Sequence, residues 1–115
     1  MDELWGPETD KADENFQVSG EPIPTHGARW LGRIKAAAAR VNAELGLLDA
    51  DKGERIAAAA DRVAAGEHDD QFPIDVFQTG SGTSSNMNAN EVLANRAGQI
   101  GGDAAVKVHP NDHVN

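Results

Sequence analysis

The chain has 115 residues with 19 acidic against 10 basic side chains, a formal net charge of −9 and no cysteine, so disulfides, thiolate metal sites and cysteine nucleophiles are excluded. The longest apolar run, around Ala57–Ala60, is far too short to cross a membrane, and the acidic N-terminus lacks the basic and apolar regions of a secretory signal. The negative charge repels phosphate backbones. We therefore expect one soluble, cytoplasmic domain with neither nucleic acid nor membrane as a partner.

Residues 1–25 combine seven acidic side chains and a single Lys11 with three prolines. This composition predicts an irregular acidic arm that contains one short helix, near Thr9–Phe16.

A longer helix is predicted from Ala28. Gly46 is its expected end, and Leu47 and Leu48 are expected to fold back onto the last turn in a Schellman contact. The apolar residues that recur at spacings of three and four along this helix are Trp30, Leu31, Ile34, Ala38, Val41 and Leu45.

A second helix is expected to begin near Asp49 or Asp51 and to continue to Gly66. Asp51 and Glu54 have the spacing of a capping box. The two helices are predicted to form an antiparallel pair. Only 22 residues are Leu, Ile, Val or Phe, whereas 19 are alanine. Because alanine favours helix but buries little area, these helices are expected to need further partners, either in this chain or in other subunits.

After the second helix, His68–Asp75 is expected to form a polar loop, and Ile74–Phe77 a short apolar stretch. The two glycines of Gly80–Thr83 then let the backbone approach a ligand, just before a helix predicted over Ser84–Gly98. The positive end of that helix and nearby hydroxyls would suit an anion. The phosphate-binding glycine motifs do not fit, which favours a carboxylate over a phosphate. Gly80–Thr83 taken alone is more typical of a flexible linker, but the amphipathic segment that follows argues against a linker.

Four asparagines of the predicted helix fit a crowded polar site, a subunit contact or an exposed polar face; they are Asn86, Asn88, Asn90 and Asn95. Ala104–Val108 is predicted to be a short extended piece, followed by a turn at His109–Asp112. His109, Asp112 and His113, together with His68, Asp69 and Asp70, contain enough nitrogen and oxygen atoms for zinc, but a metal site is disfavoured because no glutamate lies between the two turn histidines. The chemically rich ending at Asn115 is interpreted as that of a truncated chain.

Residues His68–Ala97 closely resemble class II fumarate hydratase. Val108–Asn115 resembles the next block of these enzymes, and Leu4–Gly6 with Glu14–Phe16 resembles their N-terminal stretch. Related aspartate ammonia-lyases usually carry alanine at the position of Ser81 and asparagine at the position of His109. Both positions therefore favour a fumarate hydratase.

The resemblance implies a mainly α fold, namely the N-terminal helical domain of the fumarase/aspartase superfamily over residues 1–115, without the central helical bundle and the C-terminal domain. It implies reversible hydration of fumarate to L-malate in the tricarboxylic acid cycle by a homotetramer that uses neither cofactor nor metal. Ser81, Gly82 and Thr83 correspond to substrate-binding residues. A second dicarboxylate site near the active-site entrance corresponds to His109, Pro110, Asn111 and Asp112.

The family's acid/base histidine and the serine of its mobile loop lie beyond Asn115, so the chain is expected to be inactive alone. Val106 stands where the family usually has an arginine, which weakens the match at the second site, and Glu8 replaces the usual glutamine. Two other interpretations remain open. One is a fragment of an ammonia-lyase, and the other is a non-catalytic acidic helical domain that binds a partner.

Overall fold

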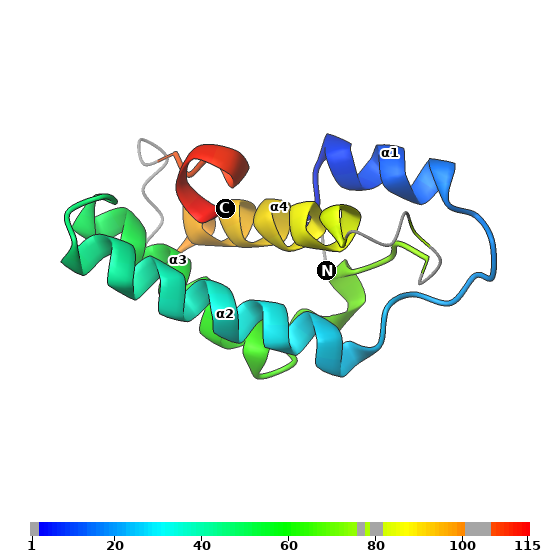
Figure 1. Cartoon of the computed structure of the whole chain (residues 1–115), viewed down its shortest axis with the longest axis horizontal. Helices are drawn as coiled ribbons and strands as arrows, with labels where there is room; N and C mark the ends of the chain where they lie inside the picture. The colour runs from blue at the N-terminus through cyan, green and yellow to red at the C-terminus, as the bar shows by residue number, and fades with distance from the viewer. Residues whose placement is uncertain (1–2, 76–77, 79–81, 101–106) are drawn as a thin grey trace.

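The computed structural model describes residues 3–75, 78, 82–100 and 107–115. Within these ranges the chain is mainly α-helical, as predicted, and the β-structure is limited to an isolated bridge between Pro22 and Asp75. No helix among the described residues is long and apolar enough to span a membrane. The helices, shown in Figure 1, are α1 (Pro7–Asn15), α2 (Thr25–Glu44), α3 (Ala50–Ala64), α4 (Thr83–Gln99) and two short turns, η1 (Asp69–Gln71) and η2 (Pro110–Val114).

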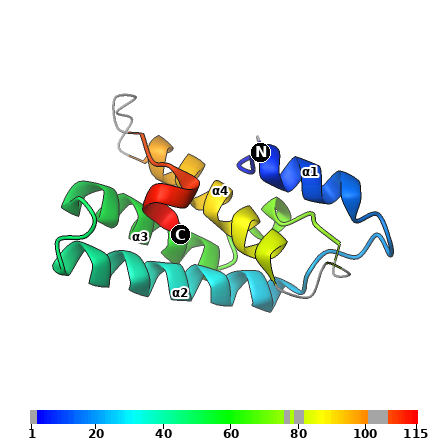
Figure 2. The ribbon, with the colours of Figure 1, turned by 45° about the horizontal axis from the view of Figure 1, so that its top comes forward.

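Helices α2 and α3 form the predicted antiparallel pair, and α4 packs across it (Figure 2). Helix α1 and the turn η2 contact other parts of the α4 surface. As a result α4 is enclosed along its middle, where Ala89, Val92 and Leu93 are at most 1% exposed. This burial supplies the tertiary contacts that an asparagine-rich sequence needs to remain helical.

The α2–α3 contact is made by small residues. A β-carbon added to Gly32 would lie 2.8 Å from the Ala64 backbone nitrogen and 2.9 Å from the Ala60 carbonyl oxygen. A β-carbon added to Gly53 on α3 would lie 2.9 Å from the Ala43 side chain. The glycines and alanines therefore allow the two backbones to approach closely, beside the buried Ile56 and Val63 of α3.

The large apolar residues of α2 do not form its buried face. Trp30, Ile34 and Leu45 are 57%, 61% and 66% exposed. The buried face carries smaller residues and one lysine, namely Ala28, Gly32, Lys35, Ala36 and Ala39. The spacing of the stripe from Trp30 to Leu45 correctly predicted a helix, but the buried face is the small-residue one, because close approach to α3 requires small residues at the contact.

The ends of α2 and α3 follow simple capping rules. Gly46 has a φ of 74°, the Leu47 N–H donates to Asn42 O over 2.9 Å, and the Gly46 N–H donates to Ala43 O over 3.1 Å. This is the predicted Schellman pattern, although Leu47 itself is 77% exposed and Leu48 makes the apolar contact.

The predicted Asp51–Glu54 capping box is wrong. The N-cap of α3 is Asp49, whose carboxylate accepts from the Lys52 N–H. Asp51 already lies in the first turn, and its carboxylate pairs with Arg55 over 3.0 Å.

Residues 68–75 do not form an exposed polar loop. His68, Gln71 and Asp75 are all at most 5% exposed. The Gln71 side chain accepts from the Leu4 N–H over 2.6 Å, and the Gln71 carbonyl accepts from Asn88 Nδ2 over 2.9 Å. The segment is buried because it lies between the N-terminal arm and α4, and Gln71 replaces water with partners from both.

Candidate functional site

The start of α4 has the geometry expected for anion binding. Gly82 is the N-cap with a φ of 82°, a left-handed conformation that favours glycine, and the helix begins at Thr83. The first turn contains no acidic residue. Its leading N–H groups and the positive end of the helix dipole are therefore not offset by a local carboxylate. Ser81 and Gly80 lie outside the described residues, whereas Thr83 is exposed.

Two side chains from other parts of the chain hold this first turn. Gln78 bonds the Ser85 hydroxyl over 3.0 Å and the Asp75 carbonyl over 3.0 Å. From α2, the Lys35 ammonium donates to Asn86 Oδ1 over 2.7 Å. Lys35 is 8% exposed, and burial lowers the pKa of its ammonium.

The asparagines of α4 fall into two groups. Asn88 and Asn90 are at most 1% exposed, so the exposed-face interpretation is wrong for them. Asn86 Nδ2 and Asn90 Nδ2 both donate to Asn115 Oδ1, over 2.9 Å and 3.2 Å. These bonds join the first turns of α4 to the end of η2. Asn95 is exposed and donates to the Leu4 carbonyl over 2.5 Å.

The turn at His109–Asp112 forms as predicted and continues as η2. His109 Nδ1 accepts from the Asn111 N–H over 3.1 Å and from the Asp112 N–H over 3.2 Å. This pattern assigns the ring proton to Nε2, which remains a donor. His113 Nδ1 accepts from the His109 N–H over 2.8 Å. Both Nδ1 atoms therefore stabilise the turn, and the described part of the chain holds no cluster of three or more metal-binding side chains.

His109, Pro110 and Asn111 line a cavity of about 520 Å³ that also touches Met87, Pro7, Glu8 and Glu91. The structure therefore brings three of the four predicted second-site residues to one hollow, while Asp112 is not among its lining residues. Val106, the position that departs from the family pattern, lies outside the described residues.

Glu91 is a structural residue that the sequence analysis did not identify. It is 3% exposed, and its carboxylate accepts from the Thr9 N–H over 2.7 Å, from Thr9 Oγ1 over 2.6 Å and from the Glu8 N–H over 3.2 Å. The carboxylate thus caps the N-terminus of α1 and ties it to α4. The sequence did contain a signal for a buried carboxylate, because Glu91 stands in the middle of the predicted helix at a position where the spacing calls for an apolar residue.

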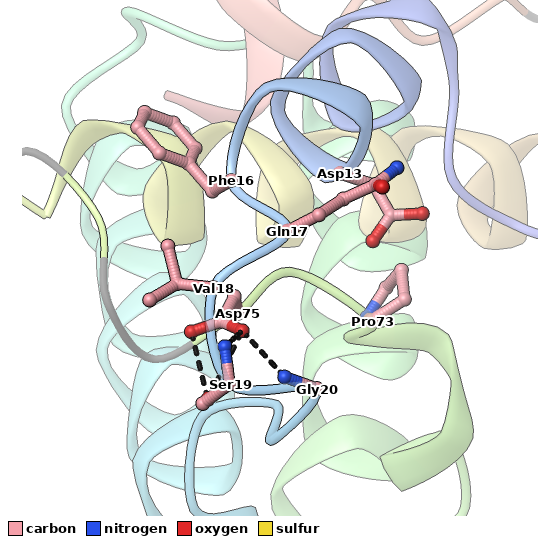
Figure 3. A pocket seen from close by; sticks show the side chains of 8 residues that line it. All are labelled: Asp13, Phe16, Gln17, Val18, Ser19, Gly20, Pro73 and Asp75. Carbon is pink, nitrogen blue, oxygen red and sulfur yellow. Dashed lines mark hydrogen bonds between the residues drawn. The ribbon is translucent and has the colours of Figure 1, made fainter.

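A second cavity, of about 490 Å³, lies between the arm and the segment before α4 (Figure 3). Its wall includes Asp75, whose carboxylate accepts from the Ser19 N–H over 2.6 Å, from Ser19 Oγ over 3.0 Å and from the Gly20 N–H over 2.9 Å. Because both oxygens are occupied by these donors, Asp75 anchors the arm.

The sequence profile of the family described as Lyase matches residues 1–115. The chain is 59% identical to the class II fumarate hydratase of Halobacterium salinarum and 56% identical to that of Xylella fastidiosa, over 99% and 100% of its own length. It spans about a quarter of the length of these relatives.

Solved structures agree with the sequence comparison. A class II fumarase from Schistosoma mansoni superposes with a TM-score of 0.92 at 37% identity, over 100% of this chain and 25% of that one. A fumarate lyase:delta crystallin from Brucella melitensis superposes with a TM-score of 0.91 at 45% identity, over 100% of this chain and 27% of that one. The chain therefore belongs to the lyase family, and over its whole length it is similar to class II fumarate hydratases.

Proposed function

We propose that this chain forms part of the substrate-binding wall of a class II fumarate hydratase, which adds water reversibly across the double bond of fumarate to give L-malate. The observation that carries the proposal is the 59% identity to such an enzyme over 99% of the chain. The start of α4 supports it physically, because a left-handed glycine followed by an acid-free first turn suits a carboxylate.

In this proposal the substrate-binding residues are Ser81, Gly82 and Thr83. Gly82 lets the backbone turn so that N–H groups face the ligand, and the hydroxyls of Ser81 and Thr83 donate to a carboxylate. Bonds of this kind hold the substrate but do not remove the proton next to its carboxylate. That step requires a base and stabilisation of the resulting dianion, which we assign to parts of the enzyme beyond Asn115.

His109, Pro110, Asn111 and Asp112 are proposed to form the second dicarboxylate site. The cavity beside His109, Pro110 and Asn111 supports this assignment, as does the Nε2–H of His109, which the turn leaves as a donor. Glu8 and Glu91 on the same wall oppose binding of an anion. Because Glu91 is already bonded by α1, Glu8 is the main unfavourable charge. The site is therefore proposed to be the weaker of the two.

The remaining features of the enzyme are proposed from the family. They are residues 1–115 as an N-terminal domain, a cytoplasmic homotetramer, a role in the tricarboxylic acid cycle, and catalysis with neither cofactor nor metal. The exposed apolar stripe of α2, with Trp30, Ile34, Val41 and Leu45 all more than half exposed, supports further packing partners.

The test is a chimera in which this chain replaces the matching quarter of the Halobacterium salinarum enzyme. Fumarate hydration is followed by loss of absorbance, and deamination of L-aspartate is assayed in parallel. The proposal predicts hydration by the chimera and none by the 115-residue chain alone. Deamination in place of hydration would favour the ammonia-lyase alternative. A folded, tetrameric chimera with neither activity would favour a non-catalytic interaction domain.

A further inference from the structure

Lys35 is a buried cation that pairs with no carboxylate of the described residues. It is 8% exposed and lies on the face of α2 that packs into the fold. None of the ion pairs among the described residues includes it, and its partner there is the neutral Oδ1 of Asn86. Because burying an uncompensated charge costs free energy, a lysine kept in this environment needs a reason other than packing.

The position of Lys35 supplies such a reason. Asn86 lies one turn after Thr83, so the ammonium is bonded to the first turns of the helix whose start is the proposed carboxylate site. The Nδ2 atom of the same Asn86 amide donates to Asn115 Oδ1 over 2.9 Å. The lysine therefore orients an amide that braces the start of α4. It also adds a positive charge at the end of α4 where the helix dipole is already positive.

We infer that Lys35 is a positioning residue of the substrate site, which holds the start of α4 through Asn86 and provides the buried positive charge that balances a bound substrate carboxylate. The inference rests on the proposed function and adds a residue to that same site. A charge that acts on substrate and transition state alike lowers KM and leaves kcat largely unchanged.

The first test is Lys35→Met in the active chimera. Methionine keeps the length and apolar stem of the side chain and removes the charge. We expect KM for fumarate to rise about tenfold, kcat to stay within about twofold and the melting temperature not to fall, since a desolvated cation has been removed. Lys11→Met is the matched control, because Lys11 is exposed and its ion pair among the described residues is with Glu8 on α1; its kinetic constants should be those of the parent chimera.

Asn86→Asp is the second variant. It separates the effect of the Lys35 charge from that of the hydrogen bond between residues 35 and 86. An aspartate can still accept from Lys35 but neutralises the ammonium, so KM should again rise. If Lys35→Met does not fold, Asn86→Asp decides the matter, and a parental KM for Asn86→Asp would overturn the inference.

Parental kinetics for a folded Lys35→Met would overturn the inference as well. So would a joint loss of kcat and melting temperature at unchanged KM, which is the signature of a merely structural lysine. An unsubstituted chimera that folds but does not hydrate fumarate would instead contradict the proposed function.

Discussion

At the residue scale, buried polar side chains determine how the segments are joined. Glu91 connects α4 to α1, Asp75 connects the segment before α4 to the arm, and Gln71 connects it to Leu4. Each carboxylate or amide accepts from backbone N–H groups of a distant segment. Bonds from backbone N–H groups to a buried carboxylate are worth more than those between neutral groups, so a few such residues organise an arm that contains little apolar surface.

Glu91→Gln tests this idea at α1. The amide keeps the shape of the side chain, but it loses the charge and presents an N–H group to the N–H donors of Glu8 and Thr9. We expect a loss of about 2 kcal/mol in the free energy of unfolding, measured with urea on the 115-residue chain. The exposed Glu44→Gln should leave stability unchanged. Equal stability of both variants would show that α1 is held by other contacts.

His68 links stability to pH. It is 5% exposed, and neither ring nitrogen has a hydrogen-bond partner among the described residues. Burial and, next, the charge of Arg96 lower the pKa of His68 below 6.5. The unfolded chain therefore binds the proton more readily than the folded chain. The free energy of unfolding is therefore unaffected by His68 above about pH 6.5, where the ring is neutral in both states. It decreases as the pH falls below that value, because the unfolded chain takes up the proton first.

The melting temperature of the chain should fall between about pH 7.5 and about pH 5, in part because His68 takes up a proton on unfolding. His68→Leu removes the group that must take up a proton, so its melting temperature should drop less between the two pH values than that of the parent chain. His26 is exposed, and His26→Leu should show the parental drop. The melting temperatures are measured by circular dichroism. An equal drop in melting temperature in all three proteins would mean that His68 does not contribute to the acid sensitivity.

At the element scale, the α2–α3 pair depends on close backbone approach. Gly32→Ala would place a methyl group 2.8 Å from a backbone nitrogen of α3, so the helices must separate. We expect a loss of about 2 kcal/mol in unfolding free energy, despite the higher helix propensity of alanine. Gly27 lies on the same helix with no atom within 4 Å of an added β-carbon. Gly27→Ala should be neutral or stabilising, and similar stability losses for both substitutions would contradict this packing argument.

At the scale of the whole molecule, the net charge of −9 opposes the compact state through mutual repulsion. Salt screens this repulsion, so thermal stability should rise between about 0.01 M and about 1 M NaCl, as the Debye length falls from about 30 Å to about 3 Å. Thermal melts over this range provide the measurement. A melting temperature independent of salt would show that attractive and repulsive charge interactions cancel in the folded chain.

The sequence predicted the helices better than their faces. Periodicity located α2, α3 and α4, and the glycines at 46 and 66 marked the ends of α2 and α3. Periodicity could not show that the small-residue face of α2 is the buried one, because that depends on how closely α3 approaches. Burial of His68 and Gln71 likewise depends on contacts with distant segments, which local patterns do not contain.

For the candidate site, the glycine turn and the helix start at Thr83 were predictable from local chemistry. Its supporting residues were not, because Lys35 is separated from Asn86 by 51 positions. The resemblance to class II fumarate hydratase named the residues that are proposed to bind the substrate. The structure adds the residues that hold the start of α4. The binding roles of Ser81, Gly82 and Thr83 stay predictions, and Ser81 also lies outside the described residues.

The most direct test of a substrate site at the start of α4 is the kcat/KM for fumarate of a Thr83→Val chimera. Valine keeps the shape of threonine and deletes the hydroxyl proposed to bind the substrate carboxylate, so we expect a fall of at least about tenfold. Thr83→Ser keeps the hydroxyl and should retain most of the activity. If the folded Thr83→Val chimera hydrates fumarate at the parental rate, the start of α4 is not the substrate site.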